Sequence, residues 1–234
     1  MGPEWLRTRG GRRALVLAAA VALTGAAVGS TYTPLFGARE IRVVGARRVS
    51  EDRIRQLGGL TLGTNVFHLD LDRTASAITA DPWIAEARLE RHLPGRIVVR
   101  VRERVPVAWA LVDGARRLVG EDGALLPGRI GPSVPELRSV GGVLDPAERA
   151  AVAGALAAMS GRTRRAVDTA FVEPDGELVF TMADGATVRY GLPTEVEAKG
   201  RALEAIRRWA AQRGTALQAI DVAVPSAPTV RPAD

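Results

Sequence analysis

Three arginines occupy alternate positions, Arg100, Arg102 and Arg104, in the stretch LPGRIVVRVRERVPVAWA. Successive residues of a β-strand point to opposite faces, so these cations share one face, while isoleucine and valine fill most of the other. Such a row of cations could bind an anion. Alternate positions on a solvated strand face are usually charged, however, and we interpret the row as the wet face of a half-buried antiparallel strand.

Other residues that could bind a metal or a phosphate group lack the neighbouring residues that such sites need. His68 and His92 each stand without a second histidine or a carboxylate at a metal-ligand spacing, and the sequence has no cysteine. The glycine-rich stretch GGLTLG lacks the Walker lysine and does not follow a strand. The sequence therefore predicts no catalytic residue, no cofactor and no metal. An extracytoplasmic enzyme, as an alternative class, would need an acid–base pair.

The net charge of +6 raises nucleic acid or an anionic membrane as partners. The basic residues are almost all arginine, with Lys199 the only lysine, and they are spread along the whole chain. Aromatic residues make up 4% of the sequence, which is too few for a base-stacking surface. We therefore predict a binding protein with neither nucleic acid nor a small-molecule substrate as its partner.

The N-terminal region has the pattern of a membrane anchor. No residue from Ala14 to Ala38 is charged, and four arginines stand just before this run. About 20 apolar residues span a bilayer, and flanking arginines stay in the cytoplasm. This predicts a cytoplasmic tail (1–13), a transmembrane helix (14–36) and a single-pass type II protein of the cell membrane. A cleavable signal peptide ending near Ser30 is the alternative, and both readings place Arg39 onward outside the cytoplasm.

The remaining chain predicts two α+β parts. Residues 38–105 indicate the order strand, helix, helix, strand, strand, with Ser50 as a helix N-cap and Trp83 largely buried. Residues 106–224 indicate a β-rich domain of antiparallel strands with flanking helices, in which Asp-Gly pairs mark the hairpins. Its helices are expected to begin at Asp145 and Thr194. The Pro-rich tail, 225–234, is expected to be disordered at its tip.

This order of elements, just outside an apolar segment, resembles a POTRA domain of the FtsQ/DivIB family of bacterial cell division proteins. The resemblance rests on IRVVGARRVSEDRI, GTNVFHLDLD and DPWIAEARLERHLPGRIVVRVRERVPVAWA, and it continues to AIDVAVPSAPTVRP. It implies a septal scaffold that binds FtsB and FtsL and helps to control septal peptidoglycan synthesis, with no active site or cofactor. An extracytoplasmic chaperone-like POTRA module is the alternative function.

The last expected strand, within ALQAIDVAV, is followed by Pro225 and is predicted to lie at a sheet edge. An open edge can be covered by a strand from a partner. The family resemblance implies FtsB as that strand, with contacts at Ala223, Val224, Ser226, Thr229, Val230 and Arg231, and with Tyr190 as a further contact. The alternative is that this strand is covered within its own domain and that the tail is inert.

Overall fold

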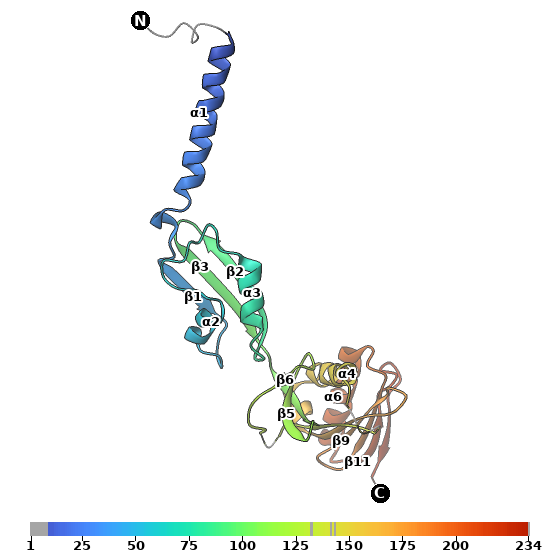
Figure 1. Cartoon of the computed structure of the whole chain (residues 1–234). Helices are drawn as coiled ribbons and strands as arrows, with labels where there is room; N and C mark the ends of the chain where they lie inside the picture. Colours follow the sequence, from blue (N-terminus) through green and yellow to red (C-terminus); the bar gives the residue numbers. More distant parts are fainter. Residues whose placement is uncertain (1–8, 132, 141, 143, 234) are drawn as a thin grey trace, which may run out of the picture. The chain divides into compact units, whose positions relative to one another are not determined.

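The computed structural model describes residues 9–131, 133–140, 142 and 144–233 (Figure 1). The chain divides into two compact units, the first ending at Glu103 and the second beginning at Arg104. Both units combine helices with a sheet, so the architecture is α+β, as the sequence predicts. The division lies near Pro106, where the sequence places the start of the second domain.

The first unit begins with α1 (Arg9–Ser30) and a short 3-10 helix, η2 (Pro34–Phe36). Every side chain described in α1, from 16 to 30, is exposed, and Val21 and Leu23 are each 72% exposed. Within the residues that the structure describes, no helix combines the length and the apolar character needed to span a membrane.

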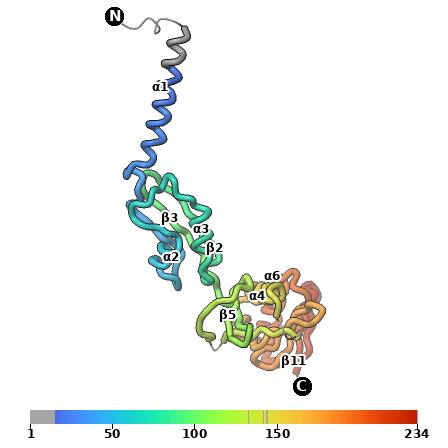
Figure 2. Tube along the Cα trace, in the orientation of Figure 1, coloured from blue at the N-terminus to red at the C-terminus, as the bar shows by residue number. Residues whose placement is uncertain are grey.

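A three-stranded sheet and two helices complete the first unit (Figure 2). The strand order is β1–β3–β2, with β1 parallel and β2 antiparallel to the central strand. The core contains Ile54 of α2 and Ile78 of α3, both fully buried against the sheet. The elements are β1 (Glu40–Val44), α2 (Glu51–Leu57), α3 (Leu71–Thr79), β2 (Ile84–His92) and β3 (Arg96–Glu103).

Local signals place most of these elements correctly. The Ser50 hydroxyl caps α2 by accepting a hydrogen bond from the Arg53 N–H, as its position predicts. The exposed Arg100 and Arg102 pair with carboxylates of β2, at 2.9 and 3.6 Å. Trp83 is only half-buried, contrary to the prediction, because its ring lies on the rim of the unit beneath the Arg48 guanidinium.

One carboxylate ties the segment after β1 to the end of β3. Glu103 interrupts the apolar face of β3, and its Oε1 accepts hydrogen bonds from the backbone N–H groups of Arg47, Arg48 and Val49, each at 2.9 Å. Burial alone would raise the pKa of the Glu103 carboxyl, but these donors together outweigh burial and hold that pKa below its ordinary value of 4.5. Gly45 lies just before these donors, at a φ of +95°, where an added Cβ would meet the Val101 carbonyl oxygen.

The second unit is built on a nine-stranded sheet in the order β12–β11–β10–β9–β8–β7–β4–β5–β6. The sheet is mixed and not antiparallel throughout as predicted, because β7 pairs parallel to β4 and β8, and β11 pairs parallel to β10. Helix α4 packs against β4, β5, β8 and α6, and these helices cover the buried face of the sheet. The strands are β4 (Pro106–Val112), β5 (Ala115–Gly120), β6 (Leu125–Leu126), β7 (Glu136–Ser139), β8 (Val167–Val172), β9 (Leu178–Met182), β10 (Thr187–Gly191), β11 (Leu217–Asp221) and β12 (Thr229–Pro232). The helices are α4 (Pro146–Ala157), α5 (Gly161–Arg165) and α6 (Val196–Arg213).

The helix starts of this unit test two predictions. Asp145 and Glu148 form the expected capping box at the start of α4. The predicted cap of α6 at Thr194 is wrong, because the N-cap is Glu195 in a left-handed conformation (φ 51°) with no side-chain hydrogen bond. Tertiary packing fixes this start, since the Tyr190 hydroxyl donates to the Val196 carbonyl at 2.6 Å.

The C-terminal end differs most from the sequence-based expectation. Strand β11 pairs parallel to β10 on one side and antiparallel to β12 on the other, so it is not the edge strand. The Pro-rich tail, which was predicted to be disordered at its tip and was not predicted to form a strand, contains β12, which is the edge. Its β-branched Thr229 and Val230 favour a strand, and Pro232 is compatible with an edge position because an outward N–H is not needed there.

We expect Glu103→Ala to lower the free energy of unfolding of the first unit by about 1–3 kcal/mol at pH 7, because three backbone donors lose their acceptor. The folded pKa lies below the unfolded one, so this stabilisation is complete above the unfolded pKa and is lost as the pH falls through the folded pKa. Native-state hydrogen exchange at the amides of β3 measures the difference. A difference between wild type and variant that stays constant below pH 4 would contradict the account.

The matched control is Glu86→Ala on the neighbouring strand. The Glu86 side chain is 41% exposed and forms surface ion pairs with Arg88 and Arg102. Exposed ion pairs contribute little, so this variant should remain within about 0.5 kcal/mol of wild type.

Candidate partner-docking edge

Strand β12 leaves one side of its backbone open. The Ala233 N–H donates to the Ala216 carbonyl at 3.0 Å, so Ala233 faces the neighbouring chain segment that leads into β11. Backbone groups alternate between the two sides along a strand. The pairing of β11 with β12 contains one register shift, but its extra residue lies on β11, so the alternation along β12 is uninterrupted. Arg231 and Thr229 therefore also turn their backbone groups toward β11. Val230 and Pro232 turn theirs to the open side.

Prolines restrict what this open side offers. Pro228 precedes β12 and Pro232 ends it. Both lie two positions from Val230, so their backbone groups face the open side as those of Val230 do. Proline has no N–H, so Val230 supplies the sole outward backbone N–H between positions 228 and 232. The carbonyl groups of all three residues face outward. Proline on an edge strand is a common protection against unwanted pairing, and here it leaves an edge that mainly accepts hydrogen bonds.

The side chains of β12 lie on two faces of the sheet. Thr229 and Arg231 stand opposite Asp221 and Ala219 of β11, on the face away from the helices. Val230 stands opposite the buried Ile220 and is 37% exposed. All of the β12 side chains are exposed, so the strand is held through its backbone.

A shallow groove runs beside this edge on the open face of the sheet. Arg189 of β10 lies in it and pairs with Glu177 at 2.9 Å and with Asp221 at 3.3 Å. The hydrogen bond to Glu177 contributes most to raising the pKa of the Arg189 guanidinium, and the hydrogen bond to Asp221 contributes next. Arg231 forms no ion pair with any described residue. The groove is lined by Thr187, Arg189, Ala219, Ile220, Asp221, Thr229, Val230 and Arg231.

Three of the predicted contacts lie in the turn between β11 and β12. Val224 is 59% exposed, Ser226 is also exposed, and Ala223 is half-buried. The Asp221 carboxylate accepts the Ala223 N–H at 2.9 Å, which fixes the start of the turn. Gly191, at a φ of +72°, allows a close approach, because an added Cβ would lie 2.8 Å from the Cβ of Ala223.

The structure places the side chain of Tyr190 in the core, where a partner strand on the edge does not reach it. Its side chain is fully buried beside Phe180, with 5.0 Å between the ring centroids. Burial raises the pKa of the Tyr190 phenol, and the charge of Glu197 raises it further. Lys199 is 2% exposed and donates to the Leu192 carbonyl at 2.7 Å. Together these two side chains hold the loop between β10 and α6.

The structure thus brings Thr229, Val230 and Arg231 onto one edge strand and leaves Tyr190 behind it. Sequence reasoning missed β12 because prolines flank a short Thr-Val pair. The two adjacent β-branched residues between the prolines, Thr229 and Val230, were the available signal. Within the described residues, no cluster of histidine, aspartate and glutamate side chains could hold a metal ion.

Comparison with known proteins identifies relatives of both units. The FtsQ-type POTRA domain model matches residues 36–104. Cell division protein FtsQ of Myxococcus fulvus is 31% identical, over 94% of this chain and 80% of that protein. FtsQ of Mycolicibacterium smegmatis is 27% identical, over 94% of this chain and 66% of that protein.

Two further matches are partial. FtsQ of Syntrophotalea carbinolica is 41% identical over 78 residues, which cover 33% of this chain and 28% of that protein. The solved extracytoplasmic domain of the cell division protein DivIB from Geobacillus stearothermophilus is 20% identical, with a TM-score of 0.37. This match covers 47% of the present chain and 92% of the DivIB chain.

Proposed function

The chain belongs to the FtsQ/DivIB family of bacterial cell division proteins, and from this premise we propose that it is a membrane-anchored scaffold of the division septum. It binds FtsB and FtsL outside the cytoplasm and helps to control septal peptidoglycan synthesis. It acts by holding partners and not by catalysis. The observation that carries this proposal is the open edge of β12, where one outward N–H stands between two prolines.

A strand of FtsB is the proposed occupant of this edge. Pairing an extended segment with an exposed strand satisfies backbone groups on both chains. The outward carbonyl groups of Pro228, Val230 and Pro232 accept three N–H groups from the added strand. The Val230 N–H donates to one of its carbonyl groups. A suitable segment therefore has free N–H groups at every second residue and no proline at those positions.

Side chains beside the edge would favour some partner strands over others. Arg231 has no carboxylate partner among the described residues, so an acidic side chain on the incoming strand would pair with it. Val230, on the other face, extends the apolar surface of the core to the edge. Val224, in the adjoining turn, adds a second exposed apolar side chain. Opposite-charge and apolar cross-strand pairs each stabilise a sheet by roughly 0.2–1 kcal/mol.

The proposed anchor is the segment 14–36, which includes most of α1. The run from Ala14 to Ala38 carries no charge, and Arg7 and Arg9 precede it. The described side chains of α1 are exposed although many are apolar, so the helix has no described protein surface to cover them. A lipid bilayer would cover them, and the preceding arginines favour a cytoplasmic N-terminus.

Replacing Val230 with proline tests the docking edge. We expect Val230→Pro to weaken FtsB binding by about tenfold or more, because the lost donor leaves a partner carbonyl unsatisfied in the interface. The fold should persist, since the removed N–H faces outward. Titration calorimetry of the full chain in nanodiscs with the extracytoplasmic part of FtsB measures the affinity.

Two matched variants separate the backbone donor from other effects. Val230→Ala keeps the N–H and should bind FtsB within a few-fold of wild type. Arg231→Pro removes a donor that faces β11 and should detach β12 from the sheet. Wild-type affinity in a folded Val230→Pro protein would rule out this edge as the docking site.

The anchor proposal predicts that the N-terminal segment is retained in the mature protein. Mass spectrometry of the chain purified from membranes should give a mass that includes residues 14–36. A mature chain that begins near Ser30 would show a cleaved signal peptide and would contradict the anchor.

A further inference from the structure

Exposed apolar side chains gather at the end of the first unit that adjoins α1. Tyr32, Leu35, Leu62, Phe67 and Leu93 are 67, 55, 71, 40 and 51% exposed, and we call these residues the helix-proximal patch. They come from three segments that are distant in sequence. These segments are the chain leaving α1, the loop between α2 and α3, and the turn between β2 and β3.

Backbone hydrogen bonds hold the three segments side by side. The Val66 N–H donates to the Phe36 carbonyl at 2.8 Å, and the Gly63 N–H donates to the Ala38 carbonyl at 2.8 Å. The Arg39 N–H donates to the Gly95 carbonyl at 2.7 Å, which joins the turn between β2 and β3 to the same exit segment. The patch is therefore a fixed surface of the unit.

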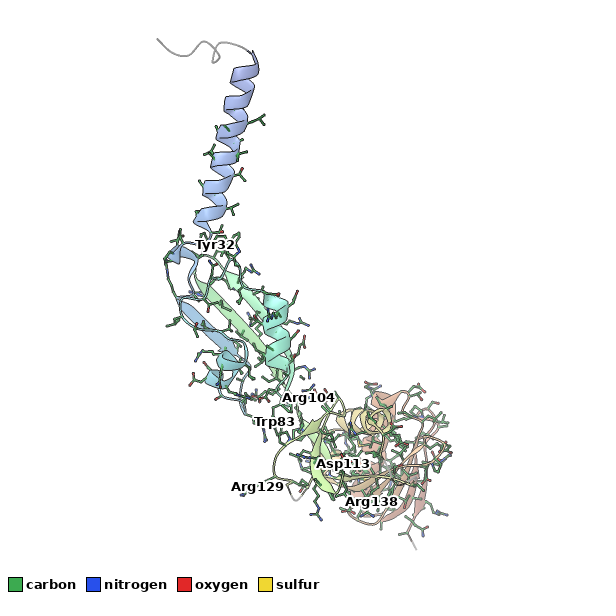
Figure 3. The ribbon with its side chains drawn as sticks, in the orientation of Figure 1. Tyr32, Trp83, Arg104, Asp113, Arg129 and Arg138 are labelled. Carbon is green, nitrogen blue, oxygen red and sulfur yellow. The ribbon has the colours of Figure 1, made fainter. Side chains whose placement is uncertain are left out.

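An aromatic contact connects the end of α1 to this surface, and Figure 3 labels Tyr32 where α1 meets the rest of the first unit. Tyr32 stacks on His68 with 4.0 Å between ring centroids, and the His68 Nε2 lies 2.9 Å from the Thr31 hydroxyl. The Asn65 side chain donates to the Thr31 carbonyl at 2.8 Å. These contacts hold the last turn of α1 next to the helix-proximal patch, so a membrane or protein that surrounds this turn would also lie close to the patch.

Arg39 and Arg91 lie beside these apolar side chains and have no carboxylate partner in the described part of the chain. Arg91 donates from both terminal nitrogens, to the Phe67 carbonyl at 2.6 Å and to the Leu69 carbonyl at 2.9 Å. Arg39 donates to the Leu35 carbonyl at 3.4 Å. Neither guanidinium forms an ion pair with a described residue, whereas the nearby Arg96 pairs with Glu40 at 2.7 Å. The patch therefore carries uncompensated positive charge at fixed positions.

We propose that the helix-proximal patch lies on the outer leaflet of the membrane, with its aromatic and leucine side chains at the headgroup level and with Arg39 and Arg91 bound to lipid phosphates. Tyrosine is typical of membrane interfaces, and cations near the surface are attracted to anionic lipids. The inference rests on the proposed anchor, since α1 would bring the patch to the bilayer. It adds that the first unit itself contacts lipid.

Spin labels on single cysteines test this placement, because the natural chain has no cysteine. The full chain is reconstituted in nanodiscs of phosphatidylcholine with phosphatidylglycerol, and labels are attached to Leu62→Cys, Val21→Cys and Leu111→Cys. Val21 lies in α1, and Leu111 is a 60% exposed leucine of the second unit. Accessibility to oxygen and to a water-soluble nickel chelate reports the depth of each label.

The expected result is a bilayer environment for Val21, headgroup depth for Leu62 and an aqueous environment for Leu111. The Leu62 label should be at least threefold less accessible to nickel than the Leu111 label. Replacing Arg39 and Arg91 by glutamine should bring the Leu62 label toward aqueous accessibility in anionic nanodiscs and change it less in pure phosphatidylcholine. Circular dichroism checks that the variants fold.

The failures of the anchor and of the patch are distinguishable. A Val21 label within the bilayer with an aqueous Leu62 label would overturn the patch and leave the proposed anchor standing. An aqueous Val21 label would contradict the anchor, and the patch with it. A Leu62 label that becomes protected only after a division partner is added would assign the surface to protein and overturn the assignment to lipid.

Discussion

The candidate docking edge depends on how the last strand of the nine-stranded sheet is held. Among the residues that the structure describes, β12 pairs with β11 alone, and all of its side chains are exposed, so backbone hydrogen bonds and not hydrophobic burial keep it in place. An unprotected edge would invite indiscriminate pairing. Pro228 and Pro232 limit that risk by leaving Val230 as the outward donor between them. The same restriction gives the edge a defined pattern that a partner strand has to match.

The core behind the edge fixes where that pattern is presented. Strand β11 is parallel to β10, and buried Ile220 and Val222 join it to the core. The close approach of Gly191 to Ala223 sets the turn that leads to β12. Tyr190 and Lys199 hold the adjoining loop from within. Tyr190 therefore supports the edge from behind it, and its side chain does not form part of the surface.

Helix caps and hairpin turns were predicted from the sequence because a few neighbouring residues determine them. Ser50 and Asp145 cap helices as expected, and the turn at Asp113–Gly114 adopts the positive φ values that suit a hairpin. Elements set by long-range pairing were missed. Strand β7 lies in a Pro/Gly-rich stretch and exists because β4 and β8 flank it, and β12 depends in the same way on β11. The family resemblance implied contacts at Thr229, Val230 and Arg231, but the strand on which these residues lie was not predicted.

Amide hydrogen exchange at Val230 tests the central claim most directly. In the full chain in nanodiscs, nuclear magnetic resonance should show fast exchange of the Val230 amide and slower exchange of the Thr229 and Arg231 amides, which face β11. Addition of the extracytoplasmic part of FtsB should slow exchange at Val230 by at least tenfold and change the other two amides less. A Val230 amide that is already protected in the free protein, or that exchanges equally fast in the complex, would contradict the account.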